Sequence, residues 1–340
     1  MNSMQTDVRA PLSNGPLARR GMTAMRAIWA RRRMLRDLLP YAALVILVVY
    51  FSLATDAFFT VENLVNIVRQ SAILMVIAVG ATLVVVAGSV DLSVGAISTL
   101  SGTLAAYTSA HGQPGLAWAM VLVGVAAGLL NGTLVAYVRL PSFIVTLGTL
   151  FIFGGIATKI VGGYAVPLQN KALDDAVNST TILGIPNGFH WAIGAIIVVS
   201  VIAYRTTFGR HLYAIGGNEK VAGLAGLPVR RDKALMFVLS GTLAAIGGLM
   251  LTARGGGSSP TMGDSFLLNA IAAIVMGGTP LSGGSGGPFR TILGVLTIVV
   301  LGDGMTLAAV DPYYQNVVFG AVVIAAVAVT VRRSEVAAVK

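Results

Sequence analysis

Long apolar runs, separated by short polar segments, recur along nearly the whole chain. A helix that crosses the roughly 30 Å hydrocarbon core of a bilayer needs about 20 apolar residues. The pattern predicts about ten such helices. They cover 38–55, 71–89, 93–110, 116–137, 142–163, 190–204, 234–252, 266–279, 289–308 and 315–331.

The segment just before the second of these runs has a different pattern. Residues 60–70 carry apolar side chains at helical spacing among polar ones. This spacing predicts a separate amphipathic helix that lies at the membrane interface instead of crossing the bilayer.

Composition indicates what surrounds these helices. Of the 340 residues, 56% are hydrophobic and only 11% are charged, and the mean hydropathy is +0.83. Soluble domains carry about a quarter charged residues, and a soluble chain of this length could not bury so much apolar surface. The sequence therefore predicts an all-α, polytopic integral membrane protein, whose transmembrane domain covers 38–331.

Positive charge indicates which way the helices cross. Ten crossings place the 1–37 tail, the loop 205–233 and the 332–340 tail on one side, together with three short connections. Of the 23 Lys and Arg residues, the four outside these segments are Arg69, Lys159, Lys171 and Arg254. Because cytoplasmic segments are enriched in Lys and Arg, we expect both termini in the cytoplasm.

The 1–37 tail is strongly basic, with eight arginines in its first 36 residues. Such a tail can bind nucleic acid. Its position directly before an apolar run favours retention of the N-terminus in the cytoplasm and contact with anionic lipid headgroups. We therefore expect the lipid bilayer, and no nucleic acid, as its partner.

On this topology the loop 164–189 is periplasmic. It contains turn-forming residues and the acidic pair Asp174 and Asp175. A solvated loop and a docking surface for an external partner explain it equally well.

The cytoplasmic loop 205–233 contains a predicted short helix. Gly216 and Gly217 predict a flexible turn, after which Asn218 is suited to cap a helix and Glu219 to occupy its first turn. Pro228 cannot continue the helix. Its apolar residues are Val221, Leu224, Ala225 and Leu227. An apolar face within a charged loop favours a partner-binding site over a simple cap on the membrane domain.

Several kinds of chemistry find no support in the sequence. The chain has no cysteine, and its three histidines are far apart, so we expect no metal site and no disulfide. No phosphate-binding loop or hydrolase motif is present. We expect no cofactor and no catalytic residue, so the protein is not predicted to be an enzyme.

Three motifs resemble one family of transport proteins. Residues 80–102, "GATLVVVAGSVDLSVGAISTLSG", resemble the hallmark of membrane permeases from bacterial sugar ABC importers of the ribose, xylose, arabinose and galactose branch. Residues 206–233 are similar to the cytoplasmic coupling region of that family, and 255–296 to its late glycine-rich region. The motifs occur in the family order, and the resemblance covers about 38–331.

The resemblance implies the function of a permease subunit in the bacterial inner membrane. Two cytoplasmic ATPase subunits would drive it, and a periplasmic binding protein would deliver a pentose or hexose. A second permease subunit, either an identical copy or a sister protein, would complete the pathway. The ATPase-coupling residues would be Asn218, Glu219, Val221, Leu224 and Leu227.

Asp91 lies in the middle of an apolar stretch, where a carboxylate needs a specific role. At a break between two helices it could accept hydrogen bonds from free N–H groups, with Ser93 sharing that role. We expect Asp91 to hold this break beside the pathway, while direct contact with sugar is the alternative. The expected pathway and helix-break residues are Asp91, Leu92, Ser93, Gly95 and, in a weak later echo of the motif, Leu281, Ser282 and Gly283.

Two other functions stay open from the residues themselves. One is an ion-coupled secondary carrier, although the few acidic residues within or near the spans, including Asp91 and Asp303, do not favour a proton relay. The other is an ABC permease for a cargo that is not a sugar. No particular sugar is favoured, because Trp118 and Trp191 are equally suited to anchor the chain at the membrane interface.

Overall fold

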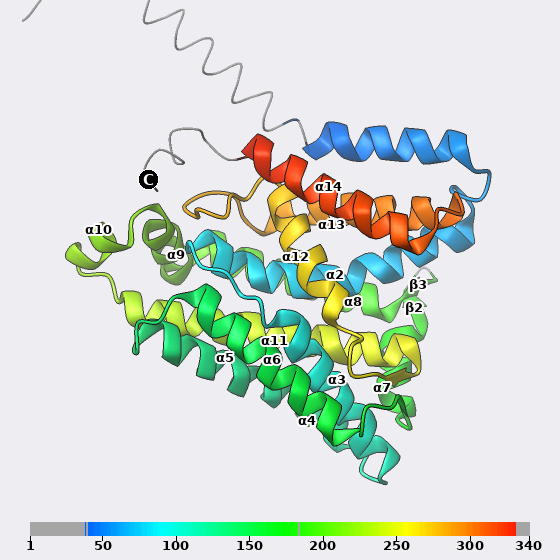
Figure 1. Ribbon diagram of the computed structural model, residues 1–340, viewed down its shortest axis with the longest axis horizontal. Helices are drawn as coiled ribbons and strands as arrows, with labels where there is room; N and C mark the ends of the chain where they lie inside the picture. The colour runs from blue at the N-terminus through cyan, green and yellow to red at the C-terminus, as the bar shows by residue number, and fades with distance from the viewer. Residues whose placement is uncertain (1–37, 39, 183, 331–340) are drawn as a thin grey trace, which may run out of the picture. The chain divides into compact units, whose positions relative to one another are not determined.

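The computed structural model describes residues 38, 40–182 and 184–330, and these are almost entirely helical (Figure 1). The predicted tails, 1–37 and 332–340, lie outside the described residues. Figure 1 places α9 (Thr207–Gly217) and α10 (Glu219–Leu224) at one end of the helices and α7 (Lys171–Asn178) at the other. We refer to these as the α10 end and the α7 end.

The remaining elements are given in chain order. The helices are Pro40–Ala54, α2 (Val61–Val86), α3 (Val94–Ala110), α4 (Leu116–Ala119), α5 (Val121–Ala136), α6 (Ser142–Ile160), α8 (Asn187–Arg205), α11 (Val229–Gly255), α12 (Asp264–Met276), α13 (Pro288–Leu307) and α14 (Pro312–Thr330). Two antiparallel ribbons lie between them, β1 (Val166–Pro167) with β4 (Gly257–Ser258) and β2 (Thr180–Ile182) with β3 (Ile185–Pro186).

Six helical segments among the described residues are long and apolar enough to cross a membrane. They are α2, Leu116–Ala136, α6, α8, α11 and α13. Two shorter apolar helices are Pro40–Ala54 and α12. The prediction of an all-α protein with membrane-spanning helices is therefore confirmed for the part of the chain that the structure describes.

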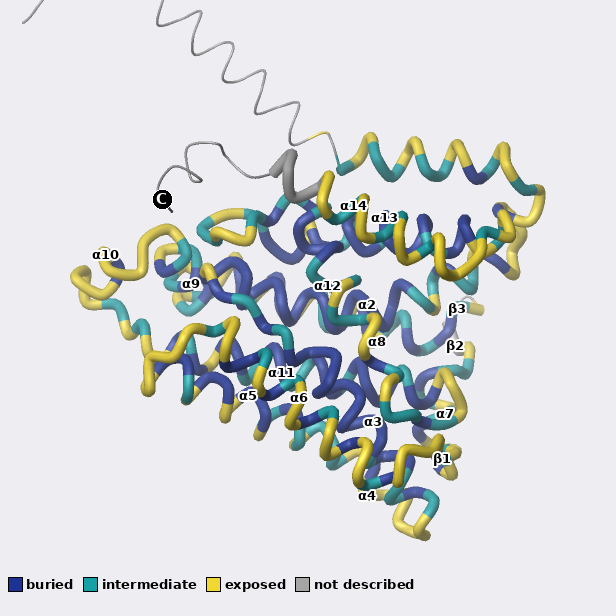
Figure 2. The backbone as a smooth tube through the Cα atoms, viewed as in Figure 1, coloured by how far each residue is buried: buried dark blue, intermediate teal, exposed yellow. Residues whose placement is uncertain are grey.

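The core is built around α2 and α11. Every residue of α2 from Ser71 to Val86 is buried (Figure 2), and α11 packs against α2, α3 and α5. By contrast, α6 and α8 expose large apolar side chains such as Phe151 and Val198. Apolar residues on the outer faces are expected where the surrounding solvent is lipid.

A row of glycines allows α5 and α11 to approach closely. Gly124, Gly128 and Gly132 recur every four residues and so share one face of α5. A Cβ atom at Gly128 would overlap the carbonyl oxygen of Phe237 and lie 2.7 Å from the Cα atom of Val238. Small residues at such positions let backbones pack closely where lipid surrounds the helices.

The prediction of a separate interfacial helix over 60–70 is wrong. Residues Val61–Val86 form one continuous helix, whose N-cap is Thr60. Neither Gln70 nor Ser71 is a glycine or a proline, so the helix continues from 60–70 into the predicted second span. Asn63 is also drawn into the core, because its side-chain amide donates to Asp303 of α13 at 2.9 Å.

The close approach of α5 and α11 predicts the effect of Gly128→Ala. Alanine is favoured over glycine within a helix by about 1 kcal/mol, but here the added methyl group has no room. We expect Gly128→Ala to lower the free energy of unfolding by about 1–3 kcal/mol, measured as unfolding in mixed detergent micelles.

Gly148→Ala in α6 is the matched control, because a Cβ atom there would meet no atom within 4 Å. It is expected to leave stability unchanged or slightly raised. Equal effects of the two substitutions would contradict the close packing of α5 on α11.

Candidate functional site

The first feature of the site is the break between α2 and α3. Helix α2 ends at Val86, Gly88 follows it with φ +73°, and the N–H of Ser89 donates to the carbonyl of Val84 at 3.1 Å. A helix commonly ends in this way when the residue after it has a left-handed backbone conformation, which glycine adopts without strain. Residues 87–93 are then non-helical until α3 begins at Val94.

Asp91 occupies the centre of this break and is buried. Its Oδ1 accepts from the backbone N–H of Ser93 at 3.0 Å and from the hydroxyl of Ser93 at 2.6 Å. Its Oδ2 accepts from the hydroxyl of Ser240 on α11 at 2.9 Å. The carboxylate thus satisfies an N–H group at the start of α3 and ties the break to α11. Ser93 does not cap α3 with its own side chain.

Polar side chains of α5 and α6 complete the support of the break. The amide of Asn131 donates to the Ser93 hydroxyl at 2.8 Å. The backbone N–H of Val90 donates to the Ser142 hydroxyl at 3.2 Å, and Thr146 donates to the Val90 carbonyl at 3.4 Å. Sequence reasoning missed these residues and Ser240. A small polar residue within an apolar run, such as Asn131 in "GLLNGTLVA", is the signal that could have found them.

The other predicted residues of this motif have different positions. Leu92 is half-buried, whereas Gly95 lies in α3 against the start of α12. A Cβ atom at Gly95 would lie 2.7 Å from the carbonyl oxygen of Gly263. Gly95 therefore allows α3 and α12 to approach, and it is not part of the break itself.

A second break follows α12 and begins with the same kind of helix ending. Gly278 has φ +88°, and the N–H of Thr279 donates to the carbonyl of Ile274 at 3.1 Å. In the turn that follows, Leu281 and Ser282 are exposed.

The structure brings one residue of the later predicted group, Gly283, to Gly88 at the start of the first break. Gly283 of the second break packs directly against the end of α2, and a Cβ atom there would lie 2.6 Å from the backbone nitrogen of Gly88. Sequence reasoning had treated the later group only as a weak echo of the first.

A second buried carboxylate lies toward the other end of α2. Asp303 accepts from Asn63 at 2.9 Å and from Asn66 at 3.0 Å. Arg254 in turn donates to the side-chain oxygen of Asn66 at 3.3 Å. Asp303 therefore connects α13 with α2 through neutral amides. Among the described residues, no group of three or more His, Asp and Glu side chains could hold a metal ion.

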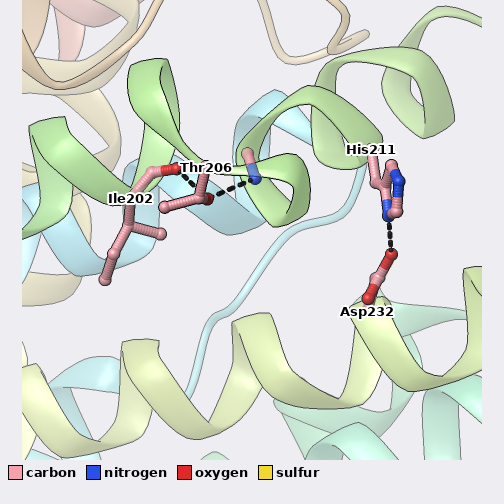
Figure 3. A network of polar contacts seen from close by, with 5 residues as sticks. Ile202, Thr206, His211 and Asp232 are labelled. Atoms are coloured by element: carbon pink, nitrogen blue, oxygen red, sulfur yellow. Dashed lines mark hydrogen bonds and ion pairs between the residues drawn. The ribbon is translucent and has the colours of Figure 1, made fainter.

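The predicted coupling region lies at the α10 end. Helix α9 begins after Thr206, whose hydroxyl accepts from the N–H of Gly209 at 3.1 Å and donates to the carbonyl of Ile202 at 2.6 Å (Figure 3). His211 of α9 contacts Asp232 of α11, with Nδ1 and Oδ2 2.7 Å apart (Figure 3). These contacts fix α9 to α8 and α11.

Asn218 caps α10 as predicted, because its side-chain oxygen accepts from the N–H of Val221 at 3.1 Å. The expectation of a flexible turn at Gly216 and Gly217 is wrong, since both belong to the last turn of α9. Asn218 alone therefore separates the two helices.

Helix α10 is shorter than the sequence predicts. It ends at Leu224, Gly226 has φ +81°, and the N–H of Leu227 donates to the carbonyl of Ala222 at 3.2 Å. Leu227 then packs against the core below α10. The extension of the helix to Leu227 is wrong because Gly226, and not Pro228, ends it.

The exposed face of α10 is apolar. Leu224 is 90% exposed and Val221 is 59% exposed, whereas Ala222 between them is buried. Glu219 is held by Lys233 of α11, with Oε2 and Nζ 2.9 Å apart. Of the predicted coupling residues, Val221 and Leu224 thus form the exposed apolar surface of α10. The other three, Asn218, Glu219 and Leu227, make contacts that hold α10 in place.

Comparison with known proteins identifies the family. Residues 63–327 match the family described as "branched-chain amino acid transport system / permease component". The chain belongs to this permease family. The permease is 38% identical over 307 residues to the ribose import permease protein of Bacillus subtilis, covering 88% of this chain and 94% of the relative.

Two further relatives come from Escherichia coli. The D-allose transport system permease protein is 35% identical over 292 residues, which cover 84% of the permease and 88% of the relative. The xylose transport system permease protein is 32% identical over 364 residues, which cover 86% of the permease and 92% of the relative. No solved structure is significantly similar to the permease.

The hydrogen bonds of Asp91 predict that Asp91→Ala destabilises the permease. The substitution leaves the N–H of Ser93 and the hydroxyl of Ser240 without this acceptor inside the protein. We expect the free energy of unfolding in mixed micelles to fall by at least about 2 kcal/mol. Asp91→Asn keeps one acceptor oxygen and is expected to cost less.

Asp56→Ala serves as the control for removal of a carboxylate, because Asp56 is exposed. Its effect on the same unfolding transition is expected to be close to zero. If Asp91→Ala were no more destabilising than Asp56→Ala, the proposed role of Asp91 in holding the break would be wrong.

Proposed function

We propose that the permease is the membrane subunit of an ATP-driven importer that moves a monosaccharide across the bacterial inner membrane. Support comes from relatives that transport ribose, D-allose and xylose and that match more than four fifths of the chain. Separate ATPase subunits supply the energy, and a periplasmic binding protein delivers the sugar. A second permease subunit completes the pathway.

We propose ten crossings with both termini in the cytoplasm. The six long spans account for part of this number, and Pro40–Ala54, α3, α12 and α14 for the rest. Helices α3 and α12 are short because the non-helical segments 87–93 and 277–287 complete their crossings. A non-helical backbone at this depth is tolerated where it is buried in protein, as it is around Asp91.

The distribution of basic residues supports this orientation. Near the α10 end lie Arg205, Arg210, Arg230, Arg231 and Lys233, all from the loop between α8 and α11 or from its flanking helical turns. The basic residues near α7 include Lys171 and Arg254, and the loop between α6 and α8 contains Lys171 alone. Because cytoplasmic segments are enriched in Lys and Arg, this distribution supports our proposal that the α10 end faces the cytoplasm.

The observation that carries the proposal of an ATPase partner is the exposure of Leu224. Its side chain is almost fully bare although α10 lies outside the long spans. Lipid cannot cover a segment that projects into the cytoplasm. We therefore propose that a protein partner covers this exposed apolar surface. We therefore assign α10 as the ATPase-docking helix, with Leu224 and Val221 as its anchors.

In the proposed mechanism, closure of the ATPase pair on ATP displaces α10 and reorients the helices around the pathway. We assign Asp91 a structural part in this mechanism, because both of its carboxylate oxygens accept hydrogen bonds that hold the break, Oδ1 from Ser93 and Oδ2 from Ser240. The permease carries out no covalent chemistry in this mechanism.

The test is purification of the tagged permease from its native membranes in mild detergent, followed by identification of the proteins that accompany it. We expect an ATPase subunit to co-purify, and Leu224→Asp to lower its recovery by about tenfold or more, as for loss of an apolar anchor. Leu224→Asp is preferable to a change at Glu219, which would also break the contact with Lys233.

Tyr164→Asp is the matched control, because Tyr164 is also highly exposed, at 78%, but belongs to the loop before α7. It is expected to leave ATPase recovery unchanged. Recovery of the permease without an ATPase, together with ribose uptake that follows an ion gradient and not ATP, would support a secondary carrier instead.

A further inference from the structure

Three segments that are far apart in the sequence meet backbone to backbone near the α10 end. They are the end of α2 at Gly88, the last turn of α9 at Gly216, and the turn after α12 at Gly283 and Gly284. We call these four glycines the glycine junction. The backbone N–H of Gly284 donates to the carbonyl of Val86 at 2.8 Å, which links two of the segments directly.

No side chain could be added at the centre of the glycine junction without displacing the backbone around it. A Cβ atom at Gly216 would overlap the carbonyl oxygen of Val86 and lie 2.6 Å from the nitrogen of Gly284. A Cβ atom at Gly283 would lie 2.7 Å from the Cα atom of Gly88. The neighbouring atoms are backbone atoms, which cannot move away as the end of a flexible side chain can.

The conformation of the junction depends on glycine as well. Gly88, Gly283 and Gly284 have φ of +73°, +82° and +73°, a region that residues with a side chain rarely adopt. Gly216 is different, because it is helical and requires glycine only for lack of space.

A further contact joins α9 to the turn after α12, a few residues from the glycine junction. The hydroxyl of Tyr213 on α9 donates to the carbonyl of Gly286 at 3.0 Å, and its ring stacks on that of Tyr204. Burial is the main cause that raises the pKa of Tyr213 above its usual value, and the neighbouring Tyr204 is the second. The hydroxyl therefore stays protonated, as a hydrogen-bond donor, at neutral pH and well above it. Helix α9 is thus held to the 277–287 turn at two places.

We propose that the glycine junction transmits the movement of the docking helix to both helix breaks. Close-packed elements change position together, because they have little free volume in which to deform separately. Only Asn218 separates α9 from α10, so a displacement of α10 moves Gly216. From Gly216 the backbone contacts pass the displacement to Gly88 and Gly284.

The connection from the junction to the buried break is short. Gly88 precedes Asp91 by three residues, and these residues are non-helical. The carboxylate of Asp91 is held at its other side by Ser240 of α11. A shift of Gly88 therefore changes the position of the 87–93 segment relative to α11, beside the proposed pathway. In this role the junction glycines are positioning residues for transport.

This inference rests on the proposed function, and the decisive comparison is between two adjacent glycines. Gly216→Ala places a methyl group inside the junction. Gly217→Ala places one in open space, with no atom within 4 Å, in the same last turn of α9. Each variant is reconstituted in liposomes with the ATPase and binding protein that co-purify with the permease, and both ribose uptake and ATP hydrolysis are measured.

We expect Gly216→Ala to retain the ATPase but to lower the ribose moved per ATP hydrolysed by at least about threefold, the scale of a perturbed coupling between sites. Gly217→Ala is expected to match the unmodified permease. An unchanged ratio in Gly216→Ala, or an equal loss in Gly217→Ala, would overturn the inference. Absence of an ATPase from the purified protein would instead defeat the proposed function, and the inference with it.

A second measurement applies even if Gly216→Ala does not fold. Because the chain has no cysteine, spin labels can be placed on Gly223→Cys, Leu281→Cys and Tyr164→Cys in pairs. On ATP binding we expect labels 223 and 281 to shift together relative to label 164, with their mutual distance unchanged. Separation of 223 from 281, or no shift of either, would overturn the inference.

Discussion

A helix that stops inside a membrane leaves polar backbone groups where water cannot reach them. The permease meets this constraint at Asp91, which accepts hydrogen bonds from the start of α3 and from α11. Because a carboxylate has no donors, the groups around it must supply every proton, and Ser93 and Ser240 do so. This single acceptor links α3 with α11 at the break, and Asn131 of α5 joins the network through Ser93.

Small residues hold the helices together elsewhere. In lipid the hydrophobic effect does not drive one helix onto another, so van der Waals contact between backbones takes over part of that role. The contact between α5 and α11 at Gly128 and that between α3 and α12 at Gly95 both have this character. The same property that allows close contact leaves little room for local adjustment, so neighbouring helices are expected to move as connected units.

Several parts of this structure could be predicted from the sequence for clear physical reasons. Apolar run length identifies the long helices, and an aspartate within such a run identifies the break. The capping of α10 by Asn218 follows from local chemistry. The end of α10 was wrongly predicted because Gly226 and Pro228 are both helix-ending residues, and the sequence does not show which acts first. The hydrogen bond of Ser240 to Asp91, and the contact of Gly88 with Gly283, join residues more than 140 positions apart, which local pattern cannot reveal.

Helix α10 has only six residues, and isolated helices of that length are not stable in water. Its shape therefore depends on its flanks: the cap at Asn218, the left-handed Gly226 and the anchoring of Leu227 in the core. The surface that we propose for the ATPase is consequently pre-organised by residues that need not touch that partner. Affinity at this surface can thus change through substitutions at its flanks while Leu224 and Val221 stay intact, because an unordered segment must first be ordered before it can bind.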